Sequence, residues 1–446
     1  MEQQRKCDVL GSFNSIVKIP DLRRRLIFVL LMCIVYRIGG IIPVPGIDAR
    51  ALMDYMGSME NTLLGMYDMF VGGAFRKMTI FALGIMPYIS ASIIIQLLGS
   101  VIPYFQRLSK EGEEGRRKIT QFTRYGTVLL SAAQAFGIAK WLESQSVSGY
   151  SIVTNPGIGF MSIVMITIVA GTVFLMWLGE QMTEHGIGNG ISLIIFLGII
   201  ARFPFAIRSE AREYMAGTRS IITEVILLAL MVLIVGAVVL ITQGQRRIRV
   251  QYPKKVIGRK IYGGQSTYIP LRVNTAGVIP IIFAQAIMFV PNTLALLVPW
   301  EFFQYAKQYF EMTHPLYWLV YGILIVFFAY FYTAIVFNPV DLADNLKKYG
   351  AVIPQKPPGK KTAEHIDKIL TRITLPGSIF LALIAIMPYF IVRFAKVNFQ
   401  FASFFGGTGL LIIVGVALDT LQQVEAKMVE RHYEGLLKGG KMRGRR

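Results

Sequence analysis

Long apolar runs, uncharged except for Arg37 in the first, dominate this sequence of 446 residues. A helix needs about 20 such residues to cross the hydrocarbon core of a bilayer. The third and fifth runs are shorter and would also suit buried or re-entrant helices, but their polar flanks favour including them. The sequence therefore predicts a polytopic, all-α membrane protein with ten spans. The runs lie near 26–42, 78–102, 125–139, 158–178, 187–201, 225–241, 276–298, 316–337, 373–392 and 401–418.

Charge supports this class and predicts an orientation. Only 16% of the residues are charged, against about a quarter in soluble globular proteins. Lys and Arg number 46 against 26 Asp and Glu, and the basic residues gather in the even loops and the termini. Positively charged loops stay in the cytoplasm, so both termini are expected to face it. Cys7 and Cys33 lack the spacing of a disulfide framework or a metal site.

Two of the basic loops, 243–275 and 338–372, are long and contain aromatic, proline and glycine residues. They could act only as topology determinants beside anionic lipid. Loops of this length usually do more than connect. The second interpretation is a docking surface for a large acidic or nucleic-acid-containing partner, and the sequence leaves both open.

The second and seventh runs contain an internal repeat. Gly84–Ile94 aligns without gaps on Gly277–Ile287, with the glycine and the proline in register. If five spans form each half, these runs correspond, and an odd number per half gives an inverted repeat. Such proteins place their working site between the halves near the bilayer midplane. Glycine and proline inside a span need neighbours or cavity water to satisfy freed carbonyls, so both segments are expected to face the interior.

Residues 61–75, between the first two runs, are too short and too polar to span a membrane but apolar enough to lie against protein. One interpretation is an interfacial helix on the outer leaflet. The other is a segment folded back into a channel mouth and hinged at Gly72 and Gly73.

Residues that would support enzyme or transport chemistry are sparse. The second, seventh, eighth and ninth runs contain no Asp, Glu, His or Arg, whereas ion-coupled transporters normally bury such groups. The segment 435–442 lacks the Ser or Thr of a phosphate loop and follows no predicted strand. An inverted-repeat transporter of small solutes is the rival to a passive, partner-driven channel. The sequence predicts no enzyme, no metal site and no cofactor.

Several long segments, in order along the chain, resemble the bacterial SecY family, the channel subunits of the protein-export translocase. These segments are Phe81–Leu98, Gly179–Phe196, Gln265–Phe283 and Asn345–Gly350, and the resemblance extends from Pro43–Gly46 to Arg431–Glu434. One departure lies at residues 355–359, where Pro357 occupies the family's usual arginine position.

The resemblance implies a ten-helix channel with two inverted five-helix halves around a pore. Secretory preproteins with signal sequences would cross it or leave it sideways into lipid. The implied partners are SecE, SecG, the ribosome and the SecA motor, which would hydrolyse the ATP, and the implied location is the bacterial plasma membrane. The implied parts are an N-terminal segment 1–25, halves 26–205 and 221–418, a hinge loop 206–220 and a basic tail 419–446.

The resemblance also implies four groups of site residues. The pore ring would comprise Ile85, Ile89, Ile191, Ile195, Ile282 and Ile412. The plug would lie near 61–75 and include Tyr67, Phe70, Gly72 and Gly73. The lateral gate would include Pro87, Ser90, Gln96, Pro280 and Gln285. Motor or ribosome docking would use Arg246, Arg247, Lys254, Lys255, Arg259, Lys347, Lys348 and Lys356.

Overall fold

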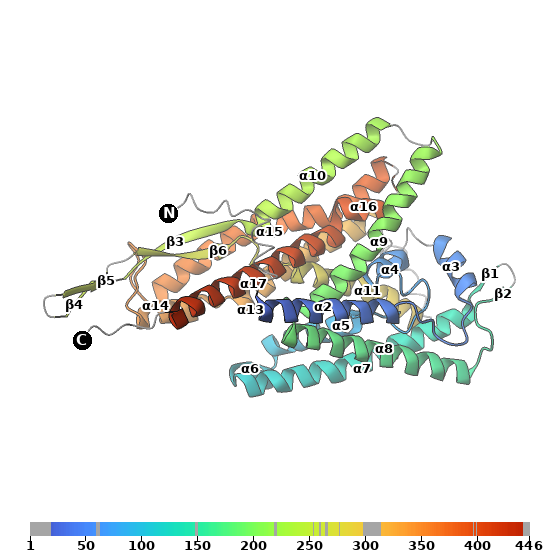
Figure 1. Ribbon diagram of the computed structural model, residues 1–446, viewed down its shortest axis with the longest axis horizontal. Helices are drawn as coiled ribbons and strands as arrows, with labels where there is room; N and C mark the ends of the chain where they lie inside the picture. Colours follow the sequence, from blue (N-terminus) through green and yellow to red (C-terminus); the bar gives the residue numbers. More distant parts are fainter. Residues whose placement is uncertain are drawn as a thin grey trace.

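The computed structural model is mostly helical, and its helices fall into two groups that follow one another along the chain (Figure 1). It describes residues 19–58, 63–147, 150–217, 221–252, 254–257, 260–263, 266–275, 277–297, 314–395, 397 and 399–439. The first group contains α2 (Pro20–Gly39), α3 (Ala49–Ser58), α4 (Leu63–Phe70), α5 (Met86–Val101), α6 (Pro103–Lys110), α7 (Glu113–Ser144), α8 (Ile158–His185) and α9 (Gly190–Met215). The second contains α10 (Ile221–Gln243), α11 (Ile279–Leu297), α13 (Pro315–Val336), α14 (Pro339–Lys348), α15 (Lys360–Ala395), α16 (Phe399–Phe405) and α17 (Gly407–Gly439).

Each predicted apolar run coincides with a helix, namely α2, α5, α7, α8, α9, α10, α11, α13, α15 and α17. Within the described residues, six helical stretches are long and apolar enough to cross a membrane, or seven if α5 and α6 count as one span bent by 99°. The chain is therefore a multi-pass membrane protein. Because α2, α7 and α11 do not pass the same test, the count of ten spans stays a prediction.

Packing divides the helices at a seam. α7 packs on α5 and α8, and α8 packs on α2 and α9, whereas α13 packs on α11 and α15, and α15 packs on α17. Between the groups, α11 contacts α5 and α7, while α9 contacts α16 and α17. One large buried hydrophobic cluster includes residues from both groups. We call it the central cluster.

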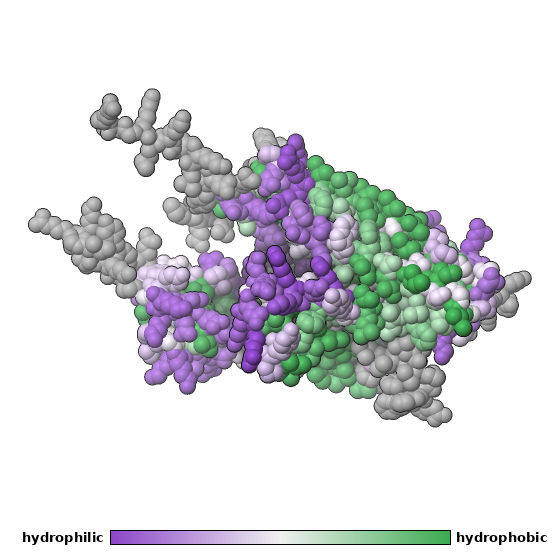
Figure 2. Space-filling model, turned by 90° about the horizontal axis from the view of Figure 1, so that it is seen from below, coloured by the Kyte–Doolittle hydropathy of each residue, from purple (hydrophilic) through white to green (hydrophobic). Residues whose placement is uncertain are grey.

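The surface has an apolar band between hydrophilic ends on the face that Figure 2 shows. The helices supply this band with exposed aliphatic side chains, such as Leu30 and Leu31 on α2 and Val232 and Leu233 on α10. Apolar surface of this extent on a helical protein suits contact with lipid rather than with water.

The described part of loop 243–275 contains β-strands, which were not predicted from the sequence. Strand β3 (Gln245–Gln251) pairs antiparallel with β6 (Ser266–Arg272), and β4 (Lys254–Ile257) pairs with β5 (Lys260–Gly263). A further two-stranded pair, β1 (Ser146–Val147) and β2 (Tyr150–Ser151), lies at the opposite end of the molecule (Figure 1). Alternation along β3, with Ile248 and Val250 buried and their neighbours exposed, matches a ribbon with one covered face.

A small hydrophobic core lies under this ribbon and joins the two long basic loops. Ile248 and Leu271 of the ribbon pack with Leu346 of α14, with Ile353 in the loop that follows it and with Ile366 of α15. The backbones also pair, because Gln251 and Val352 exchange two N–H···O bonds of 2.9 Å. We call this unit the ribbon core. It joins loops 243–275 and 338–372 at one end of the molecule, the end toward which the C-terminal part of α17 also extends (Figure 1).

Two predicted boundaries are wrong. The second run was predicted to be helical from residue 78, but residues 71–85 form successive turns and α5 begins at Met86. Met78 and Gly84 have positive φ angles of 44° and 57°, which interrupt helical hydrogen bonding. The predicted hinge loop 206–220 is helical up to Met215 in its described part. Arg202 ends the apolar run, yet Arg, Glu and Ala are strong helix formers, so α9 continues.

Candidate functional site

The internal repeat marks two equivalent helix starts. Gly84 and Gly277 both have left-handed backbones, with φ of 57° and 63°, and each lies just before its helix. Pro87 and Pro280 then occupy the second position of α5 and α11. A proline there frees no carbonyl, because the first-turn N–H groups have no intrahelical partner anyway. The repeat therefore positions these helices, and the predicted need for neighbours to rescue freed carbonyls is wrong at these two prolines.

All six residues predicted for a pore ring lie in the central cluster or pack against it. Ile85, Ile89, Ile195 and Ile412 are buried, while Ile191 and Ile282 are partly buried and pack against the same cluster. Ile85 directly precedes α5, and the others come from α5, α9, α11 and α17. Four helices from both groups therefore bring branched aliphatic side chains to the seam.

Local structure fixes the start of α9 beside this cluster. Asn189 caps the helix, because its side chain accepts hydrogen bonds from the N–H groups of Ile191 and Ser192. The preceding Gly188 donates its N–H to Gln423 Oε1 of α17 at 3.0 Å. This contact ties the first turn of α9 to the other group of helices.

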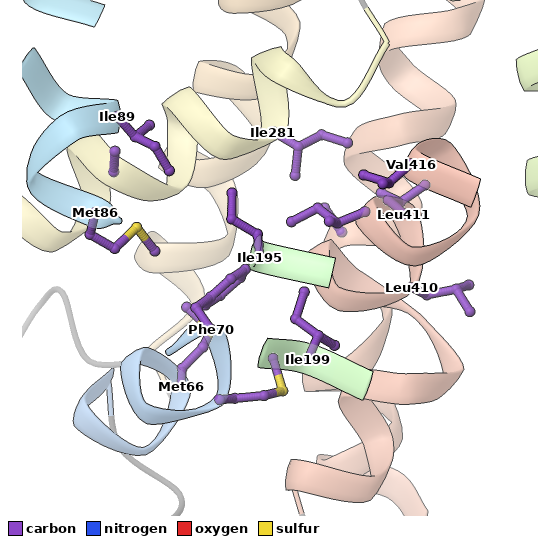
Figure 3. Packing of buried hydrophobic residues seen from close by; sticks show 14 of the residues in the cluster. Met66, Phe70, Met86, Ile89, Ile195, Ile199, Ile281, Leu410, Leu411 and Val416 are labelled. Atoms are coloured by element: carbon purple, nitrogen blue, oxygen red, sulfur yellow. The ribbon is translucent and has the colours of Figure 1, made fainter. Parts of the chain in front are cut away.

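Neighbouring residues that the sequence analysis did not select complete the cluster. Figure 3 shows Ile89 of α5, Ile281 of α11 and Leu411 of α17 around Ile195, with Ile199 one turn further along α9. Ile281 is fully buried, whereas the selected Ile282 is only partly buried. Adjacent isoleucines in a fully apolar run carry no signal that separates one side of the helix from the other.

Residues 63–75 fold inward rather than lying on the surface. We call them segment 63–75, because Asn61 and Thr62 lie outside the described residues. Met66, Met69 and Phe70 of α4 are buried in the central cluster, and Figure 3 places Phe70 next to Ile195. Of the two interpretations of this segment, the structure supports the inward fold, and the outer-leaflet helix is wrong.

Tight backbone packing holds the turn after α4. Gly72 has a φ of 73°, and a Cβ on it would lie 2.9 Å from Gly198 Cα of α9. A Cβ on Gly198 would lie 2.6 Å from the Phe70 carbonyl oxygen. The two glycines allow contact that side chains would prevent.

Polar contacts add to the hold on this segment. Tyr67 donates its hydroxyl to the Leu83 carbonyl at 2.8 Å, and Tyr36 of α2 donates its hydroxyl to the Val71 carbonyl at 3.3 Å. Asp68 forms an ion pair with Arg202 of α9, at 3.1 Å between Oδ2 and Nη2. This pair was not predicted from the sequence, although an acid in an apolar segment is a functional signal in a membrane protein. Arg202 was missed because the fifth run ended just before it.

The helices predicted to form a lateral gate lie side by side, since α5 and α11 contact one another across the seam. Pro87, Pro280 and Gln285 are buried, and Ser90 and Gln96 are partly buried. Gln96 donates to Ser92 on its own helix at 3.1 Å. Gln285 faces segment 63–75, with its Nε2 4.0 Å from Met66 Sδ.

Five of the predicted docking residues lie on or next to elements of the ribbon core. Arg246 and Arg247 on β3, Lys347 and Lys348 on α14, and Lys356 in the following loop are exposed. Lys254 and Lys255 lie on β4, and Arg259 lies outside the described residues. Among the described residues, no group of three His, Cys, Asp or Glu side chains could hold a metal ion.

Comparison with known proteins assigns the family. The SecY family model matches residues 79–421. The chain belongs to the SecY family. It is 44% identical over 427 residues to the protein translocase subunit SecY of Aquifex aeolicus, covering 95% of this chain and 99% of that protein. It is 46% identical over 428 residues to the protein translocase subunit SecY of Escherichia coli strain K12, covering 95% of this chain and 96% of that protein.

Solved structures show the same fold at lower sequence identity. One is described as the structure of a protein conducting channel, with a TM-score of 0.64 and 18% identity, over 91% of this chain and 93% of that chain. Another is Sec61 in the canine ribosome-channel complex from the endoplasmic reticulum, with a TM-score of 0.60 and 18% identity, over 91% and 93% of the two chains. The SecY-family architecture therefore extends over nearly the whole chain.

Proposed function

We propose that this chain is a protein-conducting channel that moves unfolded secretory polypeptides across a bacterial plasma membrane and releases hydrophobic segments sideways into the bilayer. The observation that carries the proposal is the convergence of six isoleucines, from both groups of helices, on one cluster at the seam. Membership of the SecY family supports it, since the Aquifex and Escherichia relatives are translocase subunits.

The six isoleucines would act as the pore ring. Branched aliphatic side chains can close around a moving chain while offering it no charge or hydrogen-bonding group. A hydrophobic constriction also resists ions because water leaves it. Segment 63–75 would act as the plug, since it already occupies the volume beside Ile195 and Ile199.

The seam between α5 and α11 would act as the lateral gate. Separation of the two helices would open the central cluster to lipid. A signal-sequence helix, about as apolar as a lipid-facing span, would then partition into the bilayer by hydrophobic transfer. Pro87, Pro280 and Gln285 lie on the buried side of these helices, where a passing signal helix would replace contacts between the two groups.

The exposed cations around the ribbon core would dock the SecA motor, which hydrolyses the ATP, or the ribosome. SecE would be the obligate membrane partner and SecG an accessory one. Loops 243–275 and 338–372 lie at one end with the C-terminal end of α17 (Figure 1). This arrangement supports a topology in which both loops and both termini face the cytoplasm, as their positive charge requires.

Ile282→Arg tests the ring. A guanidinium at the constriction would hydrate it, so we expect closed-state ion leak in planar bilayers. The matched control, Ile282→Leu, keeps the volume and apolarity and is expected to remain tight. Equal closed-state currents for both variants would contradict the ring assignment.

A second experiment tests the substrate. In a background without Cys7 and Cys33, Ile282→Cys should crosslink to a stalled secretory chain. The same substitution at a lipid-facing residue, Leu233→Cys, should not. Absence of a crosslink at position 282 with a validated stalled chain would overturn the assignment of the substrate path.

A further inference from the structure

One buried ion pair joins segment 63–75 to the first group of helices. Asp68 Oδ2 lies 3.1 Å from Arg202 Nη2, and the two side chains are 2% and 12% exposed. The other carboxylate oxygen of Asp68 accepts the N–H of Arg76 at 2.8 Å. The Asp68 carbonyl accepts the N–H of Gly73, also at 2.8 Å. The carboxylate therefore fixes both the turn after α4 and its attachment to α9.

The hydrogen-bonding contacts from the same segment to the second group of helices use thioether sulfur, and the ring of Tyr67 packs edge-on against Phe289 of α11, with 5.5 Å between ring centroids. Ser403 Oγ of α16 donates to Met69 Sδ at 2.9 Å. Tyr389 of α15 and Gln285 of α11 lie 3.7 and 4.0 Å from Met66 Sδ. A thioether is a weak acceptor, whereas a charge-assisted pair is among the stronger hydrogen-bonded contacts. The charge-assisted contact of the segment is thus with the first group of helices, whereas its contacts with the second group are apolar or use a weak acceptor.

We propose that the Asp68–Arg202 pair is a latch that retains the plug on α9 while the two groups of helices begin to separate. This inference rests on the proposed function, because it assigns segment 63–75 as the plug of a channel. Separation first breaks the sulfur contacts to α11, α15 and α16. The plug stays on α9 until the pair breaks.

Hydration of the pore determines when the Asp68–Arg202 pair breaks. In a closed, dry seam, the loss of one partner would leave a buried charge without compensation, which is costly. Water that enters an opening pore raises the local dielectric constant and weakens the attraction between the two charges. A substrate that widens and hydrates the pore therefore releases the latch, whereas thermal fluctuation of a dry pore does not.

The test measures exposure of the plug directly. The reporter is Ala74→Cys, a buried position after α4, in a background without Cys7 and Cys33. The readout is the rate of labelling by a membrane-impermeant maleimide in proteoliposomes without substrate. Asp68→Asn removes the charge and keeps an oxygen for the Arg76 N–H. Arg202→Met removes the cation and keeps an apolar stem of similar length.

Each single variant leaves the opposite charge unpaired, so we expect labelling to rise on the order of 100-fold. The double variant leaves no unpaired charge and is expected to label within about threefold of the reporter parent. Glu180→Gln is the matched control, because it removes the acid of an ion pair with Arg124 that lies far more exposed to solvent, between α7 and α8. Its labelling should equal that of the parent.

Unchanged labelling in both single variants would overturn the latch, as would a double variant whose increase equals the product of the two single increases. Circular dichroism and size-exclusion profiles identify any variant that fails to fold, and the labelling of the folded variants then decides. The ring test separates this inference from the proposed function. A leaking Ile282→Arg variant together with unlabelled latch variants would overturn only the latch. Rapid labelling without a leak in Ile282→Arg would keep the latch and overturn the ring.

Discussion

Gly198→Ala places a methyl group at the closest backbone approach between α9 and the turn after α4. Its Cβ would lie 2.6 Å from the Phe70 carbonyl oxygen and 3.3 Å from both the Gly72 nitrogen and the Tyr36 hydroxyl oxygen. Two of these neighbours are backbone atoms, so segment 63–75 itself must move. Overpacking of this kind costs about 1–3 kcal/mol.

Alanine also favours the helix by about 1 kcal/mol relative to glycine. This gain in helix stability is the same whether or not segment 63–75 lies on α9. It therefore does not offset the overpacking energy, which is present only in the closed arrangement. The ratio of closed to open protein should therefore fall by roughly 5- to 150-fold.

The assay compares closed-state ion conductance in planar bilayers for Gly198→Ala and Gly236→Ala. Gly236 lies in α10, where a Cβ would meet no atom within 4 Å, so its variant carries the same helix gain without the contact. We expect leak from Gly198→Ala only. Indistinguishable conductance in the two variants would refute the reasoning that close glycine packing seals this segment onto α9.

Two further predictions concern stability away from the seam. Leu271→Ala should destabilise the ribbon core by about 2–5 kcal/mol, because Leu271 is buried in it. Limited proteolysis should then cut residues 245–272 faster. Tyr268→Ala, on the exposed face of the same strand, should leave the cleavage rate unchanged. Glu180→Gln should lower the free energy of unfolding by no more than about 1 kcal/mol, because its Arg124 partner is half exposed. A decrease of many degrees in the melting temperature would contradict this expectation.

The helices could be predicted well from the sequence because a helix that crosses a bilayer must be apolar over a length that hydropathy reveals directly. Every apolar run overlaps a helix, although the second run begins in turns, and the runs delimit only the apolar part of each helix. α7 begins at Glu113 and α15 at Lys360, well before their apolar runs at 125 and 373, because helical hydrogen bonding continues into water. The β ribbon was missed because its strands are short and basic, and its covered face is completed only by α14 and α15.

The site was predicted in part. Family motifs selected six isoleucines that do meet in or against the central cluster, but a uniform apolar run could not show that Ile281 is more deeply buried than Ile282. The Asp68–Arg202 pair depends on a chain reversal at Gly72 and on α9 extending past its apolar run. Neither condition follows from hydropathy.

α15 is long enough to connect the ribbon core with segment 63–75. Ile366 and Leu370, near its beginning, are part of the ribbon core, whereas Tyr389, near its end, touches Met66. These 36 residues form one helix with internal prolines at 376 and 388, and proline weakens a helix locally. If a partner tilts the ribbon core, α15 is expected to carry that motion along its length to Met66 of segment 63–75, so that force applied outside the bilayer would act on the proposed plug through a single helix.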